Sequence, residues 1–207
     1  RNVALSKKYG YTPSILLFKE NTSTTVKDEN HYLSSLEDKV EILSKLGIKT
    51  FCLVDFDENF MKLTPKDFIK TIIAEKLNAK IIIVGDDYRF GYKASGNVAT
   101  LRKYEDIFAY TADIVEFEME DDQEKISSGH LRDLVRQGEI SKANKYLGRN
   151  YKIRGKVVHG KQRGRLLNFP TANLKPSFPY VVPTDGVYLT LTNIRGKDYY
   201  GLTNIGS

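Results

Sequence analysis

The sequence has one cysteine, three histidines and no long apolar run. A single cysteine, Cys52, excludes an internal disulfide and fits a reducing compartment, so we expect a cytoplasmic protein. No cysteine–histidine pair has the spacing of zinc ligands, which disfavours a zinc enzyme. No apolar stretch is long enough to cross a bilayer and no signal peptide is visible, so no membrane partner is expected.

The charge is moderately positive, with 32 Lys and Arg against 26 Asp and Glu and a net charge of +6. This excess suits phosphorylated ligands and nucleic acid equally well. The cations are spread along the chain without a basic, aromatic-rich face, so no nucleic-acid partner is expected, although a nucleic-acid-binding protein stays as the third alternative. At 207 residues and 41% hydrophobic, the chain can build one large or two modest cores.

The first part of the chain alternates apolar strands with helices. Strands are predicted at residues 14–18, 50–54, 80–84 and 113–117. Ser34 and Glu37 are predicted to form a capping box, and Thr64 and Asn97 to cap two later helices. Buried strands that alternate with helices predict a parallel sheet in a Rossmann-like α/β domain, in which ligands bind beyond the carboxyl ends of the strands.

The hydrophobic period changes to two after Arg149 and Asn150, which we interpret as the joint between domains 1–149 and 150–207. Tyr151, Ile153 and Val157 alternate with polar residues, and a hairpin turn is predicted at residues 195–196. Loops bounded by proline separate these strands. The pattern predicts a small antiparallel β-barrel.

A glycine-rich loop follows the strand at residues 80–84. Arg89 is a candidate ligand for phosphate, and Tyr88 or Phe90 for a planar ring. The same residues also fit a simple turn with Phe90 in the core, and the residues alone leave these two interpretations equal.

A second candidate site begins at Ser127 and Ser128, which are predicted to cap a helix that ends near Gly138. Hydroxyl groups at a helix N-terminus, followed by Arg132, form a plausible phosphate site. A well-capped helix without a ligand is the simpler alternative.

The third candidate site lies in residues 157–174, where a strand runs into a loop that contains Gly160, Gly164 and three cations. Glycines expose backbone N–H groups to an anion. Thr171 and Asn173 offer hard oxygen ligands to Mg²⁺. The alternative is a charged loop between two barrel strands. His159 is interpreted as a strand-end structural residue rather than a base.

The order of these motifs closely resembles bacterial riboflavin kinase in residues 159–188, which read His-Gly, Gly-Arg, Phe-Pro-Thr-Ala-Asn-Leu and then Gly-Val-Tyr. The upstream chain resembles the adenylyltransferase half of the bifunctional riboflavin kinase/FAD synthetase family. Residues 85–91 are similar to its Gly-x-Asp-Phe-x-Phe-Gly signature and residues 126–132 to Ile-Ser-Ser-Thr-x-Ile-Arg. The likeness covers nearly the whole chain.

The resemblance implies a nucleotidyltransferase domain followed by a compact Greek-key barrel. It implies phosphorylation of riboflavin to FMN and adenylylation of FMN to FAD, with ATP as co-substrate and Mg²⁺ as cofactor. The kinase residues that it implies for binding ATP and phosphate are His159, Gly160, Lys161, Gly164, Arg165, Pro170, Thr171 and Asn173, of which Thr171 and Asn173 would bind the metal. The nucleotide- and flavin-binding residues that it implies are Gly85, Asp87, Arg89, Phe90, Gly91, Gly96, Ser127, Ser128 and Arg132.

The sequence departs from the family pattern at several points. Asn168 replaces a glycine and Gly129 a threonine, and residues 18–22 lack the family's Phe-Asp-Pro-His-Pro run. No His-x-Gly-His motif occurs. A riboflavin kinase with a degenerate adenylyltransferase domain is therefore the alternative function. The first residue is Arg1 rather than Met, and the family pattern continues after Ser207, so we expect further segments at both ends, including the glutamate base of the kinase.

Overall fold

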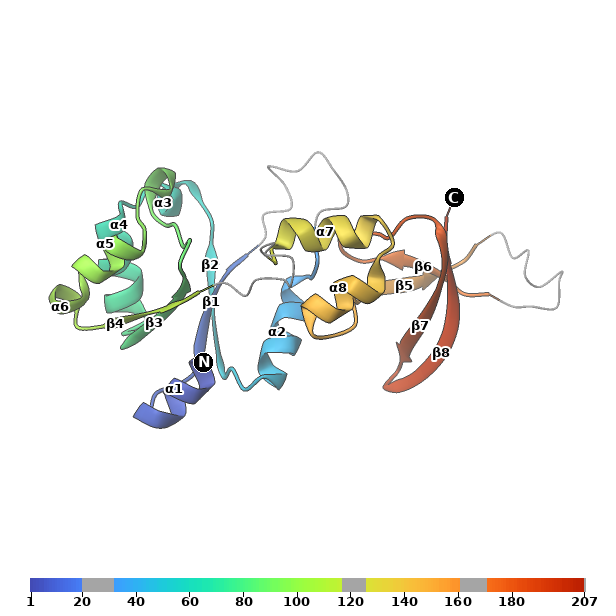
Figure 1. The fold of residues 1–207 in the computed structure, drawn as a ribbon, viewed down its shortest axis with the longest axis horizontal. Helices are drawn as coiled ribbons and strands as arrows, with labels where there is room; N and C mark the ends of the chain where they lie inside the picture. Colours follow the sequence, from blue (N-terminus) through green and yellow to red (C-terminus); the bar gives the residue numbers. More distant parts are fainter. Residues whose placement is uncertain (20–31, 117–125, 161–170, 207) are drawn as a thin grey trace. The chain divides into compact units, whose positions relative to one another are not determined.

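The computed structural model describes residues 1–19, 32–116, 126–160 and 171–206. The chain divides into two compact units. Unit 1 contains residues 1–25 and 39–125, and unit 2 contains residues 26–38 and 126–207. The course of the chain is shown in Figure 1, where both units contain helices and strands.

Unit 1 is built on parallel strand pairs. β1 (Ser14–Lys19) pairs with β2 (Thr50–Asp55), and β3 (Ile81–Gly85) pairs with β4 (Thr111–Val115). All four predicted strands are present, and the fourth begins two residues earlier than predicted. The described residues form two separate two-stranded sheets rather than one continuous sheet.

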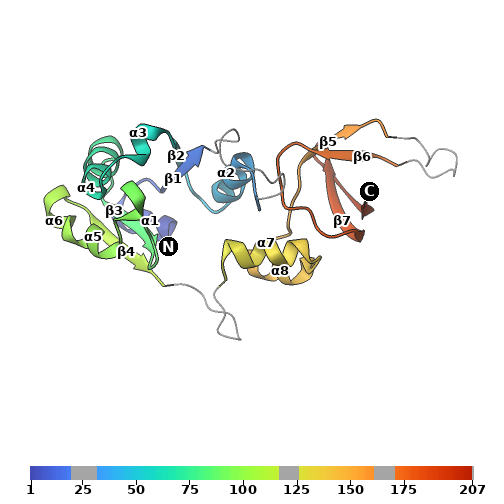
Figure 2. The same cartoon turned by 90° about the horizontal axis from the view of Figure 1, so that it is seen from above.

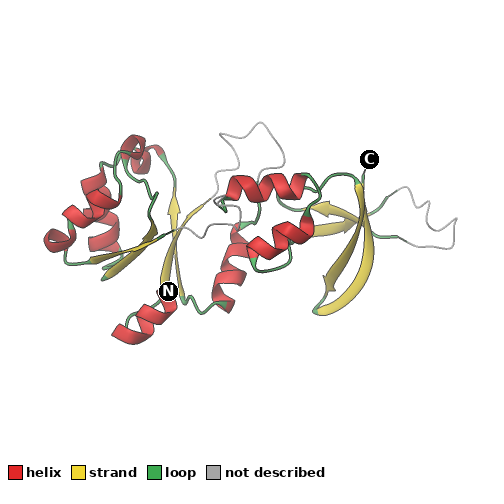
Figure 3. Cartoon of the chain, in the orientation of Figure 1, coloured by secondary structure: helices red, strands yellow, loops and turns green. Residues whose placement is uncertain are grey.

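Helices connect these strands, as Figure 3 shows in red. They are α1 (Asn2–Tyr9), α2 (Leu36–Lys45), α3 (Glu58–Met61), α4 (Pro65–Asp67), the π-helix η1 (Phe68–Lys76), the short 3₁₀ turn η2 (Tyr92–Ala94), α5 (Val98–Lys103) and α6 (Glu105–Phe108). The predicted caps Thr64 and Asn97 are confirmed, because each side chain accepts a hydrogen bond from a backbone N–H in the first turn of its helix.

The predicted capping box of α2 was wrong by one residue. Ser35 and Asp38 form it in place of Ser34 and Glu37: the Ser35 Oγ accepts from the Asp38 N–H at 3.1 Å, and the Ser35 N–H donates to the Asp38 Oδ2 at 3.1 Å. Both pairs have the same spacing in the sequence, so the pattern alone does not separate them. The division between the two units falls within α2, after Asp38.

The core of unit 1 centres on one face of η1. Phe68, Ile69, Ile72 and Ile73 are buried there. The remaining buried members of this core are Phe90, Leu101 and Tyr110. The Tyr110 hydroxyl donates to the Leu101 carbonyl oxygen at 2.6 Å, so its polar atom is satisfied inside the apolar core.

Unit 2 combines two helices with two β-hairpins. Its elements are α7 (Ser128–Arg136), α8 (Ile140–Leu147), β5 (Gly155–Val158), β6 (Asn173–Pro176), β7 (Gly186–Ile194) and β8 (Lys197–Ile205). α7 and α8 lie side by side (Figures 1 and 2) around a core of Leu134, Val135, Ala143 and Val181. The predicted turn between β7 and β8 is confirmed, since Arg195 and Gly196 have φ angles of 51° and 84°.

The described part of unit 2 does not close into a barrel. β5 pairs with β6 and β7 with β8, both antiparallel, and the two pairs are separate sheets. The predicted alternation of apolar residues is present on β7 and β8, but the apolar face is exposed: Leu189 is 75% and Leu202 76% accessible to solvent. The sequence therefore predicted the strands and their period, while the closure is not seen among the described residues.

Substituting the cap of α5 is expected to destabilise unit 1. Asn97 and Thr100 form a reciprocal capping box, so Asn97→Ala leaves the Thr100 N–H without its side-chain acceptor and should cost about 1 kcal/mol. Urea unfolding measures this difference. Asn59→Ala, at an exposed position inside α3, is the matched control and should change the free energy of unfolding by less than about 0.5 kcal/mol. Equal effects of the two variants would contradict the importance of the box.

Candidate functional site

The loop after β3 returns on itself at the carboxyl end of the strand. The Asp86 N–H donates to the Val115 carbonyl at 3.1 Å, and Phe90 and Gly96 exchange backbone hydrogen bonds of 3.2 and 2.9 Å. Asp87 and Arg89 are exposed on this loop. Parallel strands place ligand sites at this end, so the loop has the position expected of a nucleotide-binding segment.

The apolar part of this loop faces the core. Phe90 is only 6% exposed, and its ring packs at 5.3 Å from Phe68 and at 5.5 Å, nearly parallel, from Tyr88. Burial raises the pKa of Tyr88. Phe90 therefore lies in the core, as the interpretation of this loop as a simple turn predicted.

Two glycines of the loop are required by its geometry. Gly91 has φ 73° and ψ −179°, a region that only glycine adopts readily, and a Cβ atom there would lie 2.8 Å from the Pro65 backbone nitrogen. A Cβ at Gly96 would lie 2.9 Å from the Phe90 ring. Beyond Gly91, Lys93 and Ala94 are also left-handed, with φ of 52° and 54°. Non-glycine residues in this conformation are strained, and such strain concentrates at ligand-binding loops.

The second predicted site lies at the start of α7, in unit 2. The Ser127 Oγ accepts from the His130 N–H at 3.2 Å, which confirms the predicted cap. Ser128 is exposed. A Cβ atom at Gly129 would lie 3.6 Å from the Ser127 Oγ and 4.0 Å from Arg132 Nη2, so the guanidinium lies beside the first turn. Positive charge at a helix N-terminus attracts anions, which suits a phosphate.

The third predicted site lies at the end of the β5–β6 hairpin. Val158 is paired with Asn173, and this register brings His159 and Gly160 beside Thr171 and Asn173. A Cβ atom on Gly160 would be 2.6 Å from the Asn173 Cγ, so the Gly160 backbone lies close against this exposed amide. His159, Gly160, Thr171 and Asn173 are exposed. The other predicted residues of the site, Lys161, Gly164, Arg165 and Pro170, lie outside the described residues.

The donors at the end of this hairpin are compatible with a hard cation. Thr171 contributes a hydroxyl oxygen and Asn173 an amide oxygen, and Mg²⁺ takes few protein ligands together with waters and nucleotide phosphates. Within the described ranges no group of three or more His, Cys, Asp or Glu side chains gathers to hold a metal. A site with one hydroxyl and one amide needs no such group.

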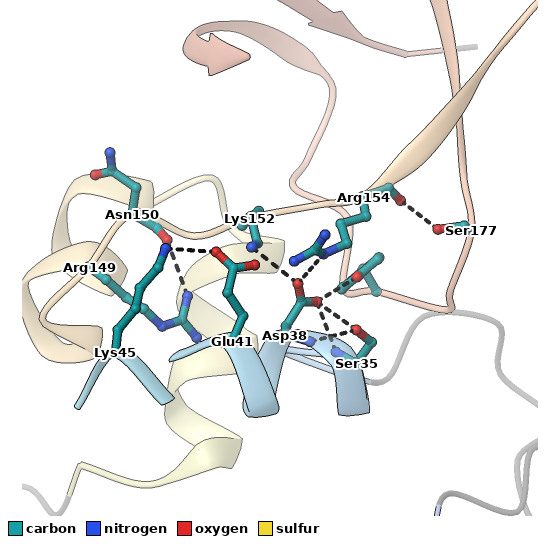
Figure 4. Close-up of polar contacts among 10 residues, drawn as sticks. Ser35, Asp38, Glu41, Lys45, Arg149, Asn150, Lys152, Arg154 and Ser177 are labelled. Atoms are coloured by element: carbon teal, nitrogen blue, oxygen red, sulfur yellow. Dashed lines mark hydrogen bonds and ion pairs between the residues drawn. The ribbon is translucent and has the colours of Figure 1, made fainter. Parts of the chain in front are cut away.

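A buried carboxylate in unit 2 was missed by the sequence analysis. Asp38 is 1% exposed, and both of its oxygens are hydrogen-bonded (Figure 4). Oδ1 accepts from Arg154 Nε at 2.6 Å and lies 3.3 Å from Lys152 Nζ. Oδ2 accepts from the Tyr180 hydroxyl at 2.6 Å and the Ser35 hydroxyl at 2.8 Å. The Ser-x-x-Asp spacing could have revealed the contact with Ser35. The contacts with Arg154 and Tyr180 have no such signal, because these residues lie 116 and 142 positions from Asp38 in the sequence.

These contacts determine the protonation of the cluster. Burial by itself would raise the pKa of Asp38, but the hydrogen bonds from Arg154, Tyr180 and Ser35 outweigh it and hold this pKa well below its usual range. Burial and the bond to Asp38 raise the pKa of Tyr180 to about 12. Asp38 is therefore ionised and Tyr180 protonated at neutral pH. Arg154 and Lys152 keep 38% and 39% of their side chains in water, so the cations are only partly desolvated.

Acid is expected to weaken unit 2 through Asp38. Because its folded pKa lies below the value of about 3.9 in an unfolded chain, its contribution is complete above that pH and is lost as the pH falls towards the folded pKa. Asp38→Asn should therefore cost about 3 kcal/mol at pH 7, and this cost should shrink between pH 4 and pH 2. Urea unfolding at each pH measures it.

The matched control is Asp133→Asn, which makes the same chemical change at a carboxylate that is 62% exposed and pairs with Arg136. Its cost at pH 7 should stay below about 1 kcal/mol. A difference between wild type and Asp38→Asn that stays constant down to pH 2 would show that the charge of Asp38 contributes nothing.

Comparison with known proteins extends the resemblance to the whole chain. Residues 1–130 match the FAD synthetase family and residues 147–207 the riboflavin kinase family. The chain is 33% identical to the bifunctional riboflavin kinase/FMN adenylyltransferase of Listeria monocytogenes, over 95% of this chain and 63% of that protein. The protein of the same name from Bacillus subtilis is 32% identical, over 98% and 64%. The chain thus spans less than two thirds of the length of these relatives.

A solved structure, named as the macrolide-efflux protein from Streptococcus pneumoniae, is also similar. It has a TM-score of 0.87 and 29% identity, covering 98% of this chain and 66% of that one. In the described part of this chain, no helix has the length and apolar character needed to span a membrane. The two family matches and the relatives confirm the predicted two-domain architecture, and the chain belongs to the bifunctional riboflavin kinase/FAD synthetase family.

Proposed function

We propose that this chain acts in flavin cofactor biosynthesis, phosphorylating riboflavin to FMN with ATP and adenylylating FMN to FAD. The two family matches cover the two activities that the names of its relatives state. The observation that supports the proposal is the close packing of Gly160 on Asn173, since it brings the glycine proposed to bind phosphate next to the amide proposed to bind the metal. We also propose a cytoplasmic location.

In the proposed kinase site, residues 159–173 bind the phosphates of ATP. Bound Mg²⁺ would neutralise charge on these phosphates, with Thr171 and Asn173 as its protein ligands. The backbone N–H groups near Gly160, together with Lys161 and Arg165, orient the nucleotide towards the hydroxyl of riboflavin. Phosphoryl transfer depends mainly on such positioning and charge. The hairpins β5–β6 and β7–β8 belong, in this proposal, to the small antiparallel barrel of domain 150–207.

In unit 1, the proposed nucleotide-binding segment for the adenylyltransferase activity is the loop after β3, where the exposed side chains bind and the buried ones shape the loop. Arg89 meets a phosphate at the end of β3, and Asp87 lies on the same exposed turn. Phe90, through its packing on Phe68, fixes the loop between Gly85 and Gly96. In unit 2, Ser127, Ser128 and Arg132 are proposed to form a phosphate site of their own at the start of α7. The parallel strands of domain 1–149 provide the Rossmann-like framework.

A kinase with a degenerate adenylyltransferase domain is the second candidate function. It is favoured by Gly129, which lacks the hydroxyl of the family threonine, and by residues 18–22, which lack the family histidine. The two functions differ in their products: the bifunctional enzyme converts riboflavin to FMN and then to FAD, while the second candidate accumulates FMN.

Removing the two metal ligands is expected to abolish FMN formation. Thr171→Ala combined with Asn173→Ala should lower kcat/KM by at least about 10²-fold, because the nucleotide loses its positioning, while the circular dichroism spectrum stays native. Chromatography of the products from riboflavin and Mg-ATP measures this. The control is Thr192→Ala with Asn193→Ala at exposed positions on β7, and equal turnover of both double variants would remove the proposed metal site.

Removing Arg132 is expected to separate the two activities. Arg132→Ala should lower the formation of FAD from FMN and ATP by about 10- to 100-fold and leave the formation of FMN unchanged, because the guanidinium belongs to the second phosphate site alone. Arg102→Ala, at an exposed position in α5, is the control. Equal rates of FAD formation in wild type and Arg132→Ala would exclude α7 from that site, and no FAD in wild type would support the second candidate function.

A further inference from the structure

Asp38 lies in the part of the chain that matches FAD synthetase, but three of its partners lie in the part that matches riboflavin kinase. Arg154, Lys152 and Tyr180 all belong to residues 147–207, and all contact the Asp38 carboxylate within unit 2. A backbone hydrogen bond connects the same two parts of the chain, because the Val181 N–H donates to the Tyr32 carbonyl at 2.9 Å. Residues 32–38 are therefore an integral part of unit 2.

These contacts are made at the base of the β5–β6 hairpin. Arg154 directly precedes β5, and its carbonyl oxygen accepts from the Ser177 N–H at 3.0 Å and the Ser177 hydroxyl at 3.3 Å. Ser177 directly follows β6, and Tyr180 follows three residues later. Figure 4 shows Asp38 and Ser177 on either side of Arg154. The buried carboxylate therefore binds Arg154, which directly precedes β5, and Tyr180, which lies four residues after the end of β6.

The opposite end of this hairpin carries Gly160, Thr171 and Asn173. Each strand has only four residues, and Val158 pairs with Asn173 at the far end of the ladder. Val157 and Leu174 are 72% and 51% exposed, so their side chains gain little support from the described core. The direction of so short a hairpin depends on how its base is held, because an angular change there displaces the far end.

We propose that Asp38 is a positioning residue for the kinase site: it fixes the base of the β5–β6 hairpin and thereby orients Gly160, Thr171 and Asn173 towards the nucleotide. This assignment rests on the proposed kinase function. It makes the formation of FMN depend on a residue from the FAD synthetase part of the chain, and it gives the buried ion pair a role in the chemistry as well as in stability.

The test is the steady-state kinetics of FMN formation by Asp38→Asn in the full chain, at a temperature where circular dichroism shows the same folded fraction as in wild type. The KM for Mg-ATP should rise about 10-fold and kcat should fall about 10-fold, since a displacement of about 1 Å can cost about 10²-fold. At equal folded fraction a purely structural role predicts an unchanged kcat and an unchanged KM, and this result would overturn the proposal. Asp133→Asn is the matched control and should change neither constant.

Tyr180→Phe is the second variant, and it decides the question if Asp38→Asn does not fold. It removes the hydroxyl that donates to Asp38 and keeps the ring that packs at 5.1 Å from Phe178. The KM for Mg-ATP should rise about threefold, and an unchanged KM would overturn the proposal. A wild-type chain that forms no FMN at all contradicts the proposed function itself, which separates that failure from this one.

Discussion

The carboxylate of Asp38 is the interaction on which unit 2 depends most, because it is fully buried while its cationic partners stay partly in water. A buried charge is costly unless hydrogen bonds satisfy it, and here five groups of four residues donate to or pair with its two oxygens. The consequence is asymmetric. The intact cluster adds modestly to stability, whereas the loss of one partner leaves the buried carboxylate less well compensated.

The contacts of Asp38 also hold residues 32–38 within unit 2. The capping interaction of Ser35 with Asp38 starts α2, and the same carboxylate binds Arg154 and Tyr180. A helix cap and an ion pair are thus made by a single side chain. The division of the chain into compact units consequently differs from the division by family match, which places residues 1–130 together.

Two of the candidate sites are formed in the same way. In each, a few backbone hydrogen bonds bring the two ends of a loop close together. The β5–β6 register places Gly160 against Asn173, and the mutual hydrogen bonds of Phe90 and Gly96 close the loop after β3. A Cβ atom at Gly96 would meet the buried Phe90 ring, and at Gly160 it would meet the exposed side-chain amide of Asn173. Exposed charges such as Arg89 are then presented from a fixed backbone.

The sequence alone determined the local features: the four parallel strands, the caps Thr64, Asn97 and Ser127, and the turn at Arg195 and Gly196. These follow from hydrophobic period and from hydrogen bonds between residues a few positions apart, which a sequence displays directly. The tertiary structure decided that Ser35 and Asp38, rather than Ser34 and Glu37, cap α2, and that Phe90 is in the core. It also decided that Asp38 meets Arg154 and Tyr180, because contacts across more than a hundred residues depend on how the elements pack and leave no periodic trace in the sequence.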